Sequence, residues 1–103
     1  MFEQAKRYMT CGIQRALPPE LITQLWAAID MQRDAGLTLD YLQVFRFEKA
    51  SNILLAIKHT QERPARATII YTNYFCIYRE ILDKTIYVID NGENSTMLFA
   101  EEY

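Results

Sequence analysis

The sequence has little of what marks most specialised protein classes. Its 103 residues include only three glycines, three prolines and two cysteines, and the formal net charge is −2. So few glycines and prolines exclude a linker or a low-complexity segment. Two cysteines are too few for a disulfide-stabilised secreted scaffold. The lack of a basic excess argues against a dedicated nucleic-acid binder, because phosphate contacts require lysine and arginine.

Long hydrophobic runs are also missing. The first seven residues contain no apolar stretch of the kind found in a signal peptide. The longest apolar runs, such as Tyr74–Tyr78, span about five residues, whereas a membrane helix needs about 20. We therefore expect a cytoplasmic protein that makes no membrane contact.

The sequence does contain enough apolar material for one core. Half of the residues are hydrophobic and 13% are aromatic. A chain of 103 residues leaves little room for a second domain, so residues 1–103 are predicted to form a single domain. Seven tyrosines and five phenylalanines indicate a sheet, because these residues favour strands.

One segment has the spacing of an amphipathic helix. It runs from about Pro19 to Ala35, with a proline in its first turn and Gly36 after its end. Its apolar side chains form one stripe, which consists of Leu21, Ile22, Leu25, Trp26 and Ile29. The single tryptophan lies in the middle of the stripe, and we expect it to anchor the core.

Most of the remaining chain is strand-like. Strands are expected within Tyr8–Leu17, Leu39–Glu48, Ile53–Thr60, Ala67–Tyr78 (with a bend at Asn73), Thr85–Asp90 and Ser95–Glu101. Gln61–Arg66 is expected to be a loop. Asn91-Gly92 between the last two strands predicts a hairpin in which both turn residues have positive φ.

These elements predict an α+β fold, with one amphipathic helix packed on a mostly antiparallel sheet of five to six strands. A half-open barrel is the alternative. One helix cannot cover a wide sheet, so part of the sheet should be left for a partner. The last strand is expected to continue into Ala100–Tyr103 as an edge strand, which could pair with a partner or with a second copy.

The single histidine, His59, is the one candidate for acid–base catalysis. Its imidazole could act with Gln61, Glu62 or Glu48. However, the sequence supplies no matched nucleophile, and a lone histidine at a strand end is usually structural. We therefore assign no catalytic residue, and a small enzyme that uses His59 with Glu62 is the least favoured function.

The sequence predicts no metal site and no cofactor. Cys11 and Cys76 lack zinc-ligand spacing and are interpreted as buried free thiols. Acidic residues around the last hairpin are Asp90, Glu93, Glu101 and Glu102. They could offer oxygen ligands to a divalent cation, but they lack the bidentate glutamate that ends a calcium loop. We interpret them as a polar hairpin tip.

A small basic group lies near the middle of the chain. It consists of Lys58, Arg63 and Arg66, and Tyr71, Tyr74 and Tyr78 follow it. Cations among aromatic residues can bind single-stranded nucleic acid by charge and stacking. With His59 and Glu62, the three cations are the candidate contacts for nucleic acid or another ligand. This function ranks second because three cations are a weak signal in a chain of net charge −2.

Several segments taken together resemble a known family. They are Arg7–Thr10 with Gly12-Ile13, Leu17–Leu21 leading to Leu25-Trp26 and Ile29-Asp30, Leu39–Phe45, His59–Glu62 before Pro64, and Val88–Leu98 with Ala100–Tyr103. In this order they resemble domain of unknown function 960, a small family from low-GC Gram-positive bacteria and their phages and mobile elements. The resemblance covers nearly the whole chain and is looser from Arg66 to Lys84.

The resemblance implies a bacterial, cytoplasmic, single-domain protein, and it implies no activity, cofactor or catalytic residue. The favoured function is therefore a non-catalytic protein-interaction domain in a bacterial or phage context. Its partner would be another protein or a second copy of the chain. Two features motivate this hypothesis: no site is recognisable, and a single helix covers a broad aromatic sheet.

Overall fold

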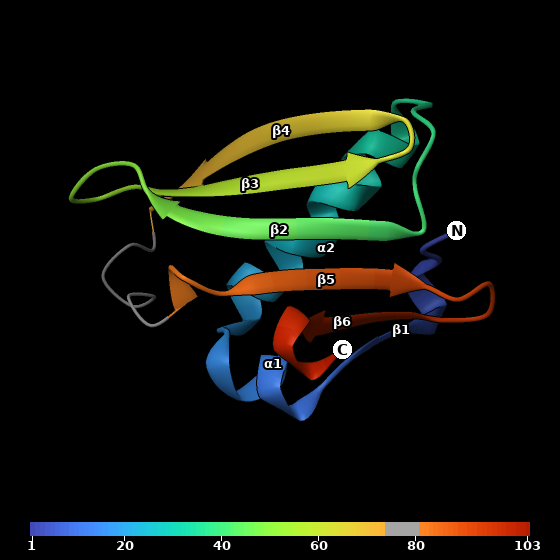
Figure 1. Cartoon of the computed structure of the whole chain (residues 1–103), viewed down its shortest axis with the longest axis horizontal. Helices are drawn as coiled ribbons and strands as arrows, with labels where there is room; N and C mark the ends of the chain where they lie inside the picture. Colours follow the sequence, from blue (N-terminus) through green and yellow to red (C-terminus); the bar gives the residue numbers. More distant parts are fainter. Residues whose placement is uncertain (74–80) are drawn as a thin grey trace.

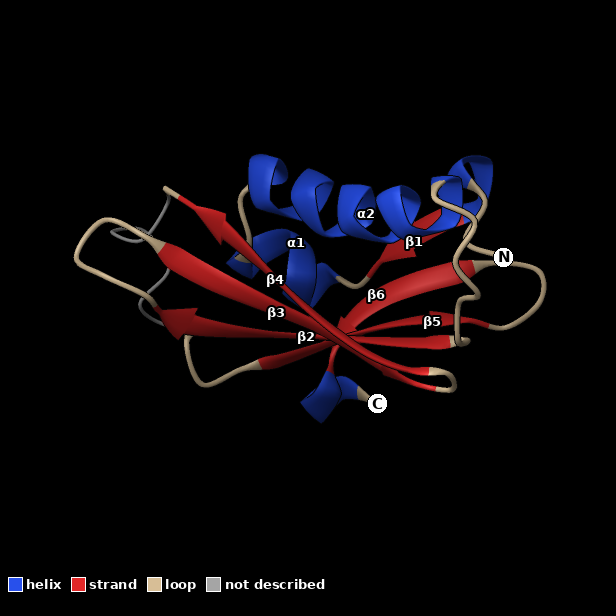
Figure 2. Cartoon of the chain, turned by 90° about the horizontal axis from the view of Figure 1, so that it is seen from above, coloured by secondary structure: helices blue, strands red, loops and turns tan. Residues whose placement is uncertain are grey.

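The computed structural model describes residues 1–73 and 81–103. It shows a six-stranded sheet with both α-helices on one face (Figures 1 and 2). The elements in chain order are η1 (Gln4–Lys6), β1 (Arg7–Met9), α1 (Cys11–Ala16), α2 (Pro19–Asp34), β2 (Leu42–Lys49), β3 (Leu55–Glu62), β4 (Ala65–Thr72), β5 (Thr85–Asp90), β6 (Ser95–Phe99) and η4 (Ala100–Glu102). The predicted α+β fold with one main helix is confirmed.

The sheet has the strand order β1-β6-β5-β2-β3-β4. Neighbouring strands are antiparallel except for β1 and β6, which are parallel. The chain starts at one edge, crosses to the centre through α2 and β2, and reaches the other edge with β4. The hairpin of β5 and β6 then returns to β1. One edge is therefore the three-residue β1 and the other is the eight-residue β4.

Helix α2 lies across one face of the sheet, which we call the inner face (Figure 2). Pro19 occupies its first position, and Gly36, with a φ of +80°, follows its end. The apolar stripe packs on the sheet, with Leu21, Ile22, Leu25 and Ile29 buried. Trp26 is only partly buried at the margin of the core. The expectation that it anchors the core is therefore wrong, because the centre of the stripe is filled by the smaller aliphatic side chains.

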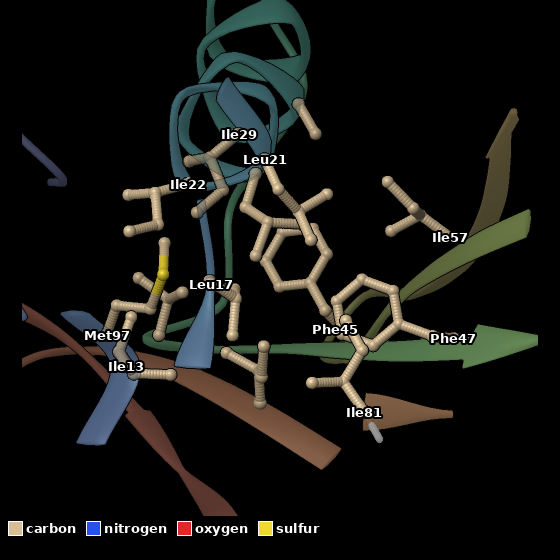
Figure 3. Packing of buried hydrophobic residues seen from close by; sticks show 14 of the residues in the cluster. Ile13, Leu17, Leu21, Ile22, Ile29, Phe45, Phe47, Ile57, Ile81 and Met97 are labelled. Atoms are coloured by element: carbon tan, nitrogen blue, oxygen red, sulfur yellow. The ribbon is translucent and has the colours of Figure 1, made fainter. Parts of the chain in front are cut away.

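The core fills the space between α2 and the inner face (Figure 3). Alternate residues of the central strands enter it, as the period of a strand requires. These include Phe45, Phe47, Ile57, Ile86, Val88 and Met97, all at most 2% exposed. Each buried side chain of this size contributes about 1.5–3 kcal/mol relative to exposure.

The segment after β1 differs from the prediction of a strand over Tyr8–Leu17. The strand ends at Met9, and Cys11–Ala16 form α1. Thr10 causes the change, because its hydroxyl accepts a hydrogen bond from the Ile13 N–H and caps the helix. Cys11 is consequently exposed, so the expectation of a buried thiol there is wrong. Cys76 lies outside the described residues.

The predicted loop Gln61–Arg66 is mostly strand. β3 extends to Glu62 and β4 begins at Ala65, so only Arg63-Pro64 forms the turn. Proline suits this position because its fixed φ favours a turn. The predicted strand Ala67–Tyr78 is confirmed as far as Thr72, and its continuation over residues 74–78 lies outside the described residues.

The last hairpin is confirmed, although its turn is longer than predicted. Asp90 pairs with Ser95, so four residues connect the strands, and of these only Gly92 has a positive φ, +97°. The Asn91 side chain shapes the turn by accepting hydrogen bonds from the N–H groups of Glu93 and Asn94. Among the described residues, no helix is both long and apolar enough to cross a membrane.

The expected edge strand over the C-terminal residues is wrong. β6 ends at Phe99, and Ala100–Glu102 form η4 instead. β6 is also not an edge, because β1 pairs with its outer side. The sequence pattern could not reveal this pairing, since β1 is three residues long and lies at the other end of the chain.

Candidate functional site

The five predicted contact residues do not form one site. Lys58 and His59 are neighbours on β3 and therefore point to opposite faces of the sheet. Lys58 is exposed on the face that carries neither α1 nor α2, which we call the outer face, whereas His59 is 2% exposed beneath α2. Glu62 and Arg63 are exposed at the turn, and Arg66 is partly buried against the end of α2.

His59 belongs to a buried network of amide side chains. Its Nε2 lies 2.6 Å from Gln43 Oε1, and its Nδ1 lies 3.5 Å from Gln32 Nε2. Gln43 uses its own Nε2 to donate to Gln61 Oε1 and to the Asp40 carbonyl. The Gln43 oxygen therefore accepts from the imidazole, and a neutral ring with its hydrogen on Nε2 satisfies both contacts.

Arg66 and Gln61 extend this network to the segment that follows α2. Arg66 Nη1 donates to Gln32 Oε1 at 2.9 Å, and its Nη2 donates to the Thr38 carbonyl at 2.7 Å. Gln61 Nε2 donates to the same carbonyl at 3.1 Å and to the Pro64 carbonyl at 2.8 Å. The network thus joins the end of α2, and the segment that leads from α2 to β2, to side chains of β2, β3 and β4.

The environment of His59 suits a structural role. Burial, assisted by the charge of Arg66, lowers the pKa of His59 to about 4, so the imidazole is neutral at neutral pH. The ring stacks on Phe45 with 4.4 Å between centroids. Its polar neighbours are amides, and Glu62 and Glu48 are exposed rather than in contact with it. The structure does not bring His59 and Glu62 together as an acid–base pair.

Three of the four acidic residues of the last hairpin and the C-terminal segment contact backbone N–H groups or a lysine of this chain. Their partners are as follows: Asp90 accepts from the Phe2 N–H at 2.7 Å, Glu101 pairs with Lys84 at 2.8 Å, and Glu102 accepts from the Phe99 N–H at 2.8 Å. Glu93 is exposed. In the described part of the chain, no group of three or more His, Cys, Asp or Glu residues could hold a metal ion.

β4 presents an open edge of the sheet. It pairs with β3 without interruption from Ala65 to Thr72, and no described residue pairs with its other side. In an antiparallel strand every second residue turns its N–H and C=O away from the partner. Proteins usually protect such edges with charges, proline, bulges or short strands. β4 has only Arg66 as a charge, and that guanidinium is bound to Gln32 and Thr38.

Two cations lie side by side on the outer face. Arg46 on β2 is directly opposite Lys58 on β3, and Ile69 on β4 is opposite Lys58 on the other side. Ile69 and Tyr71 are 55% and 59% exposed. Within residues 1–73 and 81–103, no ion pair involves Arg46 or Lys58. Figure 2 shows both helices on the inner face and η4 on the outer one.

Sequence reasoning found Lys58 but missed Arg46. The alternation around Phe45 and Phe47 places Arg46 on the opposite face, so its exposure could have been predicted from the strand period. Its position opposite Lys58 depends on the register of β2 and β3, which the turn between them sets. Tyr74 and Tyr78 of the predicted basic and aromatic group lie outside the described residues.

Comparisons with known proteins agree with this architecture. The model of a family described as Staphylococcal protein of unknown function (DUF960) matches residues 6–102. A crystal structure of a protein of unknown function from Enterococcus faecalis has a TM-score of 0.84 and 24% sequence identity, over 99% of this chain and 94% of that chain. At this identity the likeness shows the fold alone. No curated protein matches the chain.

Proposed function

Because the chain belongs to the DUF960 family of staphylococcal proteins of unknown function, we infer its role from its own surfaces. We propose a non-catalytic protein-interaction domain that forms a homodimer through the β4 edge. The proposal includes a cytoplasmic setting in a Gram-positive bacterium or one of its phages, and the staphylococcal description of the family supports the Gram-positive part of it. The amide partners of His59 support a non-catalytic role, since none of them is an acid, a base or a nucleophile.

The unprotected β4 edge carries this proposal. Its eight residues expose Ile69 and Tyr71 on one face and a row of backbone groups along the edge. A long edge strand with exposed apolar side chains is a template for another strand. The opposite edge offers only the three residues of β1.

A second copy of the chain fits this edge well. Consider a two-fold axis perpendicular to the sheet through Ile69, which pairs two β4 strands antiparallel. Ile69 then faces its own copy, and the small Ala67 faces the large Tyr71. Arg66, the only charge of the strand, faces Thr72, so no like charges meet. Residues directly opposite each other share a face, so the outer faces of both copies become continuous.

Sedimentation velocity over a wide concentration range tests the dimer. The chain is expected to sediment as a dimer, and Ile69→Lys is expected to be a monomer, because two lysines would face each other at the axis. Ile53→Lys is the matched control, since Ile53 is 69% exposed but lies in the loop between β2 and β3. A chain that stays monomeric at its highest concentration contradicts the proposal.

A charge-swap experiment tests the register. Ile69→Lys and Ile69→Glu are each expected to be monomeric, whereas an equimolar mixture should recover the dimer through Lys–Glu contacts at the axis. Recovery in the mixture requires the two side chains at position 69 to face each other. Dimers that persist in both separate variants would show that association uses another surface.

A further inference from the structure

The opposed cations of the outer face have no evident structural purpose. Arg46 and Lys58 face each other in the middle of the sheet, where directly opposed like charges destabilise the pair. Their other cross-strand neighbours are Thr85 and Ile69, which carry no charge. The outer-face acid two residues along β2, Glu48, forms no ion pair with either cation. A partner that supplies negative charge would relieve this repulsion.

We propose that this part of the outer face binds an acidic segment of another protein, with carboxylate side chains on either side of an apolar stretch. The inference rests on the proposed dimer. In that dimer, outer-face side chains that are cross-strand neighbours form one row across the seam, which is the line where the two β4 strands pair. The order of the row is Arg46, Lys58 and Ile69, and then Ile69, Lys58 and Arg46 of the second copy. The row has cations at both ends and an apolar centre.

The dimensions of the row define the partner. The two Lys58 positions lie three strand spacings apart, which is about 14 Å. Tyr71 and Ala67 border the two isoleucines on the same face, so the apolar centre is wider than a single row. A protein segment with apolar residues in its middle and acidic residues at both sides complements this pattern in charge and in polarity.

The same face is poorly suited to a nucleic acid. Glu48 and Glu62 lie at the ends of β2 and β3, where an extended phosphate backbone running along the strands would meet them. Arg66 is turned towards Gln32 and is not available on this face. The net charge of −2 gives no general attraction for a polyanion. Discrete carboxylates therefore fit the two cations better than a continuous row of phosphates.

Fluorescence anisotropy with two labelled probes tests the inference. One probe is a peptide with a pair of glutamates on each side of four leucine and alanine residues, and the other is an oligothymidylate of the same charge. The peptide is expected to bind. Lys58→Glu is expected to weaken peptide binding by about tenfold or more, because the new carboxylate lies opposite Arg46 and cancels the positive charge at both ends of the row. Arg15→Glu is the matched control, since Arg15 is exposed on α1 at the inner face.

Sedimentation of the same samples separates the two proposals. A monomeric wild-type chain would overturn the proposed dimer and, with it, the row across the seam. A dimer whose peptide affinity is unchanged by Lys58→Glu would overturn this inference alone. Oligothymidylate binding that equals or exceeds peptide binding would also overturn it, in favour of a nucleic-acid surface. Loss of peptide binding in a Lys58→Glu chain that is still a dimer would support it.

Discussion

The two edges of the sheet, β1 and β4, differ in how they are held to the rest of the molecule. At the β1 edge, the segment before the strand folds back, and Phe2 is 0% exposed. At the β4 edge, the side chains of Ile69 and Tyr71 are more than half exposed, and in β1 the side chain of Tyr8 is exposed to the same degree. Within residues 1–73 and 81–103, both edges contain backbone groups without a strand partner, so a missing partner alone does not distinguish the two edges. The difference lies in the kind of long-range contact, since ion pairs hold the first edge and hydrogen bonds of Arg66 and Thr68 hold the second.

The contacts at the first edge converge on Arg7 and Asp30. Arg7 forms an ion pair with Asp30 of α2, lies 4.7 Å above the ring of Trp26, and donates to the Phe2 carbonyl at 2.8 Å. Arg33 adds a second ion pair to Asp30 at 3.2 Å. The short β1 is thus joined to the middle and end of α2 by ion pairs, whereas the longer β4 pairs with β3 and contacts only the end of α2, through hydrogen bonds of Arg66 and Thr68. We therefore expect mutations at the β1 edge to lower the free energy of unfolding more than a mutation at the β4 edge.

The largest effect is expected from Phe2→Ala. Removing a fully buried phenylalanine leaves a cavity and should cost about 3–5 kcal/mol of the free energy of unfolding, measured by urea denaturation. Met31→Ala is the control, because Met31 is 70% exposed and its replacement should change stability by less than about 0.5 kcal/mol. Equal effects of the two substitutions would show that the first residues do not close this edge.

Asp30→Asn should destabilise the β1 edge in a pH-dependent way. Burial alone would raise the pKa of Asp30, but the hydrogen bonds and charge of Arg7 outweigh it, and the pKa is lowered below 3.8. A lowered carboxylate pKa stabilises the fold above the unfolded pKa, and this contribution is lost as the pH falls through the folded pKa. We expect a loss of about 2–3 kcal/mol at pH 7, because Arg7 is left without its partner. The difference from wild type should shrink below about pH 4.

His59→Gln tests the interior between the two edges. The pKa of His59 is lowered to about 4 in the folded protein, whereas the unfolded chain titrates near 6.5. Protons therefore bind the unfolded chain more tightly, and stability falls as the pH drops below about 6.5. Wild type should lose about 2 kcal/mol between pH 7 and pH 5 through this residue, and the variant should lack that loss. Parallel pH profiles of stability for the two proteins would contradict the buried neutral imidazole.

Ile69→Lys should have the smallest effect on the fold. In a dilute, monomeric sample the free energy of unfolding should fall by no more than about 1 kcal/mol, because the position is exposed and the new lysine only adds repulsion from the opposed Lys58. Differential scanning fluorimetry at low concentration measures this. A large loss of stability in the monomer would mean that β4 needs its apolar surface for the fold itself, and the two edges would then be less different than described.

Local patterns in the sequence were sufficient for the main elements. The stripe from Leu21 to Ile29, with Pro19 and Gly36 at its ends, predicted α2 to within a residue. The strand-like pattern over Leu39–Glu48 predicted β2, which begins three residues later, at Leu42. Each of these signals lies within one segment, where periodicity and turn chemistry can be recognised.

Contacts between distant segments could not be predicted in this way. The burial of His59 depends on Gln32 from α2 and Gln43 from β2, and the pairing of β1 with β6 depends on residues 88 positions apart along the chain, such as Arg7 and Ser95. The six-residue α1 is too short for a helical period, and only Thr10 signals its start. The candidate surface itself required the register of three strands, since no motif marks Arg46 and Lys58 as neighbours.

The parallel pairing of β1 with β6 also has a consequence for biosynthesis. β1 is synthesised well before β6, which is its strand partner within the described residues. Until β6 emerges, Phe2 cannot be held by Asp90 within a completed sheet, and the apolar surface of α2 has only part of its cover. β1 therefore has no strand partner until β6 has been synthesised, and the six-stranded sheet is complete only after that point.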